Sequence, residues 1–182
     1  PPSPNKSGML KDPGVFDAAW VPGDLRHRDE ELRDLAAILE TYAATPVRII
    51  GPSGVGKTAT VKYALEDMDR HLEGVETAYV DAWDQHKPAR TLYALLESLP
   101  ARTGPLHHTT PAQDLLEGIR KAIDDRTVVV IDEADMLQAR ELLLELHAID
   151  ELKLVLVANR GDDIVDGLGT VQSNALQSGE EL

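Results

Sequence analysis

The chain has 182 residues, the size of one compact domain, and its hydrophobic share of 42% includes only 4% aromatics, so Leu, Val, Ile and Ala must build the core. It contains no cysteine, which excludes disulfides, thiolate metal sites and thiol catalysis. The net charge of -14 is spread along the chain, which argues against broad, non-specific DNA binding by this segment because such binding needs a clustered basic face.

The even excess of acidic residues is also typical of proteins from salt-loving organisms, in which concentrated salt screens the self-repulsion. An ordinary acidic domain is the alternative. No apolar run approaches the roughly 20 residues that a membrane span needs, so no membrane contact is expected. Residues 1–14 lack the apolar core of a signal peptide and are predicted to be a flexible lead-in. A cytoplasmic location is therefore expected.

Hydrophobic periodicity predicts strands that alternate with helices along one domain, residues 15–182. The predicted strands cover residues 47–50, 77–82, 128–132 and 153–159. The predicted helices cover residues 29–43, 57–72, 89–99, 112–123 and 137–146. This alternation indicates the α/β class, with a mostly parallel sheet covered by helices on both faces. After Asn159 the chain is rich in Gly and Asp, and no convincing terminal element is predicted.

A glycine-rich loop lies between the first predicted strand and the helix that follows it. The loop and the start of this helix comprise Gly51, Pro52, Ser53, Gly54, Val55, Gly56, Lys57, Thr58 and Ala59. In a strand, loop and helix context, this spacing predicts a P-loop whose backbone N–H groups cradle phosphates. Lys57 would then bridge the β- and γ-phosphate oxygens, and the Thr58 hydroxyl would bind Mg²⁺. A chance match in a glycine-bearing turn is the alternative.

Two carboxylates, Asp132 and Glu133, follow the continuous apolar strand at residues 128–131. They are expected at the carboxyl edge of the sheet, beside the glycine loop, where open α/β sheets bind ligands. Asp132 would hold Mg²⁺ through its water shell, and Glu133 would polarise the attacking water as general base. The alternative is a solvated acidic turn that opens a helix.

Asn159 ends the next predicted strand, so its amide is expected at the same edge of the sheet. There it could hydrogen-bond the γ-phosphate or the lytic water, which makes it a third catalytic candidate beside Glu133 and Lys57. An asparagine at a strand end is also a common turn residue.

The order of glycine loop, acidic strand end at residues 128–135 and polar Asn159 resembles the AAA+ ATPases, with Asn159 in the sensor position. Residues 16–30 resemble the segment before the P-loop in archaeal replication initiators of the origin-recognition and cell-division-control family. Residues 78–83 and 92–96 are similar to the second strand and helix of that family. The resemblance covers about residues 16–182.

The resemblance implies an ATPase domain that binds ATP or ADP with Mg²⁺ and places the base in an adenine pocket formed by Val21, Pro22 and Arg28. It implies slow hydrolysis as a switch for origin DNA binding and loading of the replicative helicase, with self-association as a further possibility. Members of the family continue into a helical lid and a winged-helix domain, and neither is expected to fit after Leu182.

Two departures from the family pattern bear on catalysis. Arg160 stands where the family more usually has an acid, and residues 168–176 contain no arginine, although the candidate arginine finger is expected there. Because an arginine finger is worth several powers of ten in turnover, the sequence predicts nucleotide binding without fast hydrolysis. A non-catalytic nucleotide-binding module, a decayed paralogue and a helper ATPase of another AAA+ branch are the alternatives.

Overall fold

The computed structural model describes residues 46–101, 104, 107–124, 126–138, 140–160 and 180–181. The predicted helix at residues 29–43 lies outside the described residues, as do the three predicted adenine-pocket residues Val21, Pro22 and Arg28.

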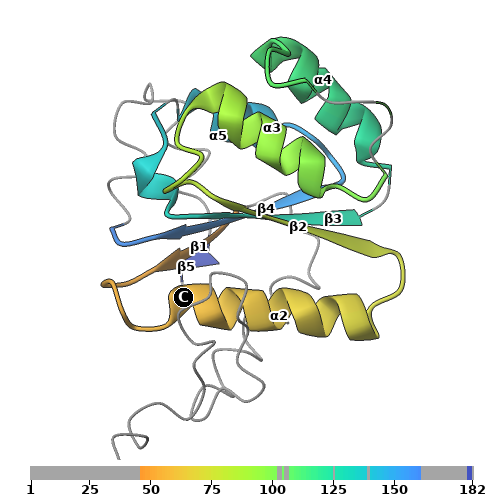
Figure 1. The fold of residues 1–182 in the computed structure, drawn as a ribbon. Helices are drawn as coiled ribbons and strands as arrows, with labels where there is room; N and C mark the ends of the chain where they lie inside the picture. Colours follow the sequence, from red (N-terminus) through yellow and green to blue (C-terminus); the bar gives the residue numbers. More distant parts are fainter. Residues whose placement is uncertain are drawn as a thin grey trace, which may run out of the picture.

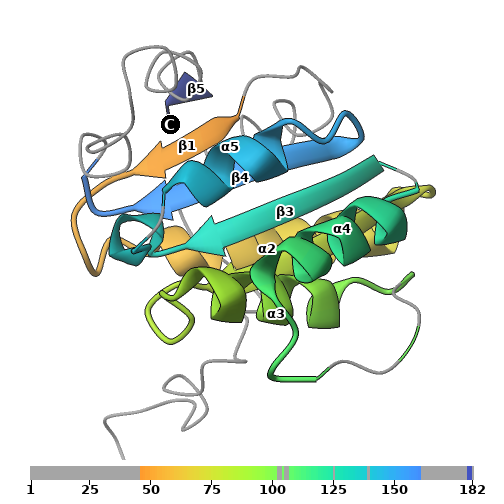
Figure 2. The same cartoon turned by 90° about the horizontal axis from the view of Figure 1, so that it is seen from above.

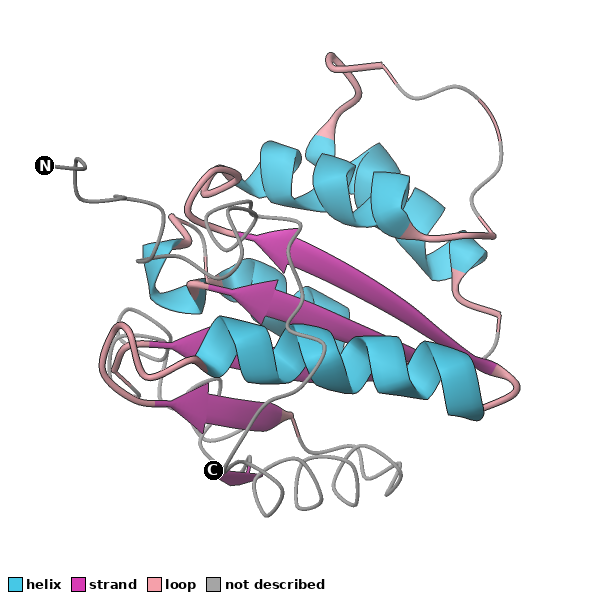
Figure 3. Cartoon of the chain, turned by 60° about the horizontal axis from the view of Figure 1, so that its bottom comes forward, coloured by secondary structure: helices cyan, strands magenta, loops and turns pink. Residues whose placement is uncertain are grey.

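The centre of the fold is a parallel sheet (Figure 1). Its strands are β1 (Val47–Ile50), β2 (Val75–Asp81), β3 (Arg126–Asp132), β4 (Leu152–Ala158) and β5 (Glu180–Glu181). They lie in the order β2-β3-β4-β1-β5, and every neighbouring pair is parallel. All carboxyl ends therefore meet at one edge of the sheet, to which the arrowheads in Figure 3 point.

Helices cover both faces of this sheet, as the figures show from two directions (Figures 1 and 2). One face carries α2 (Lys57–His71). The opposite face carries α3 (Pro88–Ser98), α4 (Ala112–Ala122) and α5 (Glu141–His147). The predicted α/β fold with two covered faces is confirmed. No helix in the described ranges is long and apolar enough to cross a bilayer.

Two details differ from the sequence prediction. The helix expected from Leu137 begins only at Glu141, because a 3₁₀ turn at Ala134–Met136 is followed by extended backbone at Leu137. Leu137 is nevertheless buried, as its place in the hydrophobic pattern predicts. Only the helical backbone conformation predicted for this residue is wrong. The chain also has a terminal strand, since Glu180–Glu181 pairs with β1 through backbone hydrogen bonds that two acidic residues do not signal.

The two covered faces determine on which side Asp132 emerges. Side chains alternate along β3, so Val128 and Val130 pack toward α2 while Val129 and Ile131 pack toward the opposite helices. Asp132 continues the series of Val128 and Val130. Its carboxylate therefore lies on the α2 side, where the glycine loop enters its helix.

Leu95 on α3 is fully buried in the core cluster of the three-helix face. Its replacement by alanine is expected to lower the free energy of unfolding by about 2–5 kcal/mol, because transfer free energy and packing contacts are both lost. Glu97→Ala, an exposed change on the same helix, should alter stability by less than about 0.5 kcal/mol. Urea denaturation of both variants measures the difference, and equal effects would contradict the assignment of Leu95 to the core.

Candidate functional site

The glycine loop has the backbone conformation that phosphate cradles require. Gly54 and Gly56 have φ values of 83° and 92°, which is the left-handed region where glycine carries no steric penalty. Gly56 precedes α2, and its carbonyl accepts the backbone hydrogen bond of Thr60 at 2.9 Å. No side chain caps the N-terminus of this 15-residue helix, so its first N–H groups and positive dipole end can act on an anion.

The Lys57 ammonium lies between the loop and the end of β4. Its Nζ donates to the carbonyl oxygens of Gly51 at 2.7 Å and Pro52 at 3.1 Å, and to Asn159 Oδ1 at 3.2 Å. All three acceptors are neutral. An anionic phosphate oxygen would be a stronger acceptor for the same charge, so the lysine can exchange these contacts for a ligand.

Asp132 is buried, with 2% of its surface exposed, and both of its carboxylate oxygens accept hydrogen bonds. Oδ2 accepts from the Thr58 hydroxyl at 2.6 Å and from the Tyr79 hydroxyl at 2.7 Å. Oδ1 accepts from the backbone N–H of Glu133 at 2.9 Å. The carboxylate thus connects β3 to α2 and to β2.

Sequence reasoning missed Tyr79. Its strand was predicted, and alternation places Tyr79 on the same face as the strand's terminal Asp81, which is in register with Asp132. The register is known only from the fold, so the sequence carries no signal that separates Tyr79 from an aromatic core residue. Burial raises the pKa of Tyr79 far above its ordinary value, and the Asp132 charge raises it further. The hydroxyl therefore stays protonated and remains a donor.

Glu133 is bound to Asn159, whose Nδ2 donates to Glu133 Oε2 at 2.8 Å. Glu133 has φ 51° and ψ 42°, a left-handed conformation that costs a residue with a side chain about 1–2 kcal/mol. Burial raises the pKa of Glu133, the charges of Asp132 and Asp135 raise it further, and the Asn159 hydrogen bond and Lys57 act in the opposite direction. Backbone strain of this kind clusters at functional sites.

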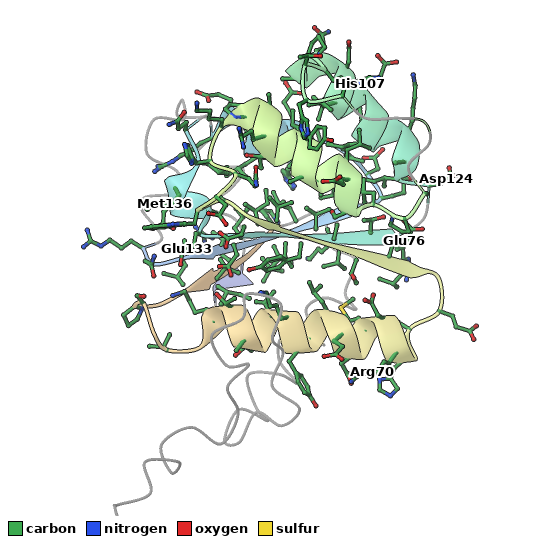
Figure 4. All side chains as sticks on the ribbon, in the orientation of Figure 1. Arg70, Glu76, His107, Asp124, Glu133 and Met136 are labelled. Carbon is green, nitrogen blue, oxygen red and sulfur yellow. The ribbon has the colours of Figure 1, made fainter. Side chains whose placement is uncertain are left out.

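The structure brings the predicted residues of the described region to one edge of the sheet. They are Gly51, Pro52, Ser53, Gly54, Val55, Gly56, Lys57, Thr58, Ala59, Asp132, Glu133 and Asn159. In Figure 4, Glu133 marks this edge and Glu76 lies at the opposite one. The arrangement can bind an anion at the loop and a cation at the carboxylates.

The side-chain oxygens of Thr58 and Asp132 suit a magnesium ion, because Mg²⁺ prefers hard oxygen ligands. Within the described residues, no group of three or more His, Asp or Glu side chains could hold a metal by itself. A cation at this edge would therefore depend on phosphate oxygens and waters for most of its ligands, as Mg²⁺ with a bound nucleotide usually does.

A family model described as AAA domain matches residues 40–162, a span that contains the glycine loop, both acidic residues and Asn159. The chain belongs to this AAA family. The assignment agrees with the parallel sheet and with the polar residues at its carboxyl edge.

The AAA domain is homologous to archaeal ORC1-type DNA replication proteins. It is 28% identical over 178 residues to ORC1-type DNA replication protein 9 of Halobacterium salinarum, covering 96% of this chain and 50% of that protein. It is 30% identical over 179 residues to ORC1-type DNA replication protein 1 of the same organism, covering 96% and 58%. The Aeropyrum pernix ORC1 protein, solved in complex with DNA, superimposes with a TM-score of 0.74 at 26% identity, covering 90% and 46%. The chain thus spans about half the length of these proteins.

Glu133→Gln is expected to stabilise the AAA domain at pH 7 and to have no such effect near about pH 3. Folding raises the pKa of Glu133, so the folded state binds this proton more tightly than the unfolded state does. The ionised side chain therefore destabilises the fold above the usual carboxyl range, and the penalty disappears as the pH falls below it.

Denaturation at both pH values measures this difference, with the exposed Glu97→Gln as the matched control. A gain in stability of equal size at pH 7 and pH 3 would show that charge is not its cause.

Proposed function

We propose that residues 15–182 form a nucleotide-binding AAA+ domain that binds Mg-ATP and hydrolyses it slowly to ADP and phosphate. The observation that carries the proposal is a closed ring of contacts at the sheet edge. Lys57 donates to Asn159, Asn159 donates to Glu133, and the Glu133 backbone donates to Asp132. Asp132 accepts from Thr58, the neighbour of Lys57 in the chain. The ring contains the groups that phosphoryl transfer to water requires.

In this proposal the glycine loop and the start of α2 bind the triphosphate with their backbone N–H groups, and Lys57 neutralises part of its charge. Thr58 and Asp132 hold Mg²⁺, which supplies charge neutralisation at the β- and γ-phosphate oxygens. Val21, Pro22 and Arg28 are proposed to bind the adenine.

Glu133 is proposed to orient and polarise the attacking water. Its raised pKa makes it a stronger base than an ordinary carboxylate, and the Asn159 amide fixes one of its oxygens. Turnover is expected to be slow because residues 168–176 contain no arginine. That composition also favours a second candidate function, a module that binds nucleotide without hydrolysing it.

The relatives extend the proposal to DNA replication. We propose that nucleotide state in this domain acts as a switch for origin DNA binding and helicase loading in the cytoplasm, with self-association as part of the switch. Support comes from the homology to ORC1-type replication proteins and from the DNA complex of the Aeropyrum pernix protein. The net charge of -14 and the Halobacterium relatives support operation in concentrated salt.

Lys57→Ala is expected to weaken ATP binding by about 10- to 100-fold, because a hydrogen-bonded charge at the phosphates contributes about 1.5–3 kcal/mol. Calorimetric titration with ATP and Mg²⁺ measures the change. Lys121→Ala removes the same charge from an exposed site on α4 and should leave affinity unchanged. Wild-type affinity in Lys57→Ala would contradict the phosphate assignment of the loop.

Glu133→Gln is expected to slow single-turnover ATP hydrolysis by about 10²- to 10⁴-fold while ATP affinity is retained, because the amide cannot accept a proton from water. Glu97→Gln, at an exposed position on α3, is the control for loss of a carboxylate. Equal rates in Glu133→Gln and the unmodified chain would remove the catalytic function and leave the non-hydrolysing module.

A further inference from the structure

Tyr79 reaches Asp132 from β2, a strand that contributes no residue to the ring of contacts described above. Its neighbour across the sheet is Val130, and two residues further along the same face Asp81 is in register with Asp132. The tyrosine ring packs against the core cluster on the α2 side, and Lys62 Nζ lies 4.8 Å from its centroid. Both contacts fix the ring, so the hydroxyl has a defined position 2.7 Å from Asp132 Oδ2.

The three hydrogen-bond donors to Asp132 belong to different elements of the fold. The Thr58 hydroxyl belongs to the helix that follows the glycine loop, so its position is tied to the phosphate cradle. The Tyr79 hydroxyl comes from β2, and the Glu133 N–H comes from the turn after β3. Without Tyr79, Oδ2 would be held only by the residue that is itself a candidate cation ligand. Tyr79 therefore supplies a hydrogen bond to Oδ2 that does not depend on the glycine loop.

We propose that Tyr79 is a positioning residue for the magnesium site: its hydroxyl holds the Asp132 carboxylate in the orientation that receives the cation of Mg-ATP. The inference rests on the proposed function, since Thr58 and Asp132 are its cation residues. It adds a residue that acts through Asp132 and touches neither the phosphates nor the attacking water. The role is one of pre-organisation, because a carboxylate already oriented loses less freedom when the cation binds.

The test is Tyr79→Phe, which removes the hydroxyl and keeps the ring that packs against the core and Lys62. ATP affinity is measured by calorimetry in EDTA and across a series of Mg²⁺ concentrations. The Mg²⁺ concentration for half-maximal effect should rise about tenfold, while affinity in EDTA stays at the wild-type value. Tyr63→Phe is the matched control. Tyr63 lies on α2, and this substitution also removes a tyrosine hydroxyl, but away from Asp132.

A second arm tests whether Tyr79 acts through Asp132. In an Asp132→Asn background, Tyr79→Phe should cause no further change in Mg²⁺ dependence, because coupled residues are not additive. Additive effects of the two substitutions would overturn the proposal, and so would wild-type Mg²⁺ dependence in Tyr79→Phe. An equal loss of ATP affinity in EDTA would also overturn it, because that loss indicates a structural role. If the unmodified chain binds no Mg-ATP, the proposed function fails and this inference fails with it. A negative Tyr79→Phe result beside normal wild-type binding leaves the proposed function intact.

Discussion

The buried carboxylate of Asp132 is the group on which the geometry of the site depends. A carboxylate with so little exposure is stable only when hydrogen-bond donors replace its lost water. Its donors come from α2, from β2 and from the turn after β3. Satisfying this one group therefore restricts how helix, strand and turn can sit relative to one another, which is more constraint than apolar packing alone would impose at a sheet edge.

Strand order explains how the remaining polar groups meet. β4 lies between β3 and β1, so the residue that follows β4 is adjacent to the residues that follow both neighbours. Asn159 accordingly contacts Glu133 after β3 and Lys57 after β1, although Lys57 and Asn159 are 102 residues apart in the chain. An amide suits this central place because it accepts from the ammonium with its oxygen and donates to the carboxylate with its nitrogen.

Much of this arrangement could be predicted from sequence because it follows local rules. Continuous apolar runs predict strands covered on both faces, and parallel strands bring their end residues to one edge. The contribution of Tyr79 could not be predicted, because an aromatic residue in a half-buried strand fits core packing equally well. The late start of α5 was missed for a related reason: Leu137 is buried like a helix residue but has extended backbone. The strand Glu180–Glu181 depends on backbone pairing with β1, of which side-chain patterns give no sign.

Two features of Glu133 at this edge of the sheet destabilise the free domain, and a bound cation would offset one of them. Glu133 has a left-handed backbone; burial raises its pKa, and the charges of Asp132 and Asp135 raise it further. A fold selected for stability alone would replace one of these carboxylates with a neutral residue. A divalent cation with its phosphates would reduce the repulsion between the carboxylates, so the same groups that destabilise the free domain would favour its complex. In the proposed function, the stability of the domain and its affinity for Mg-ATP would therefore be linked through one set of charges.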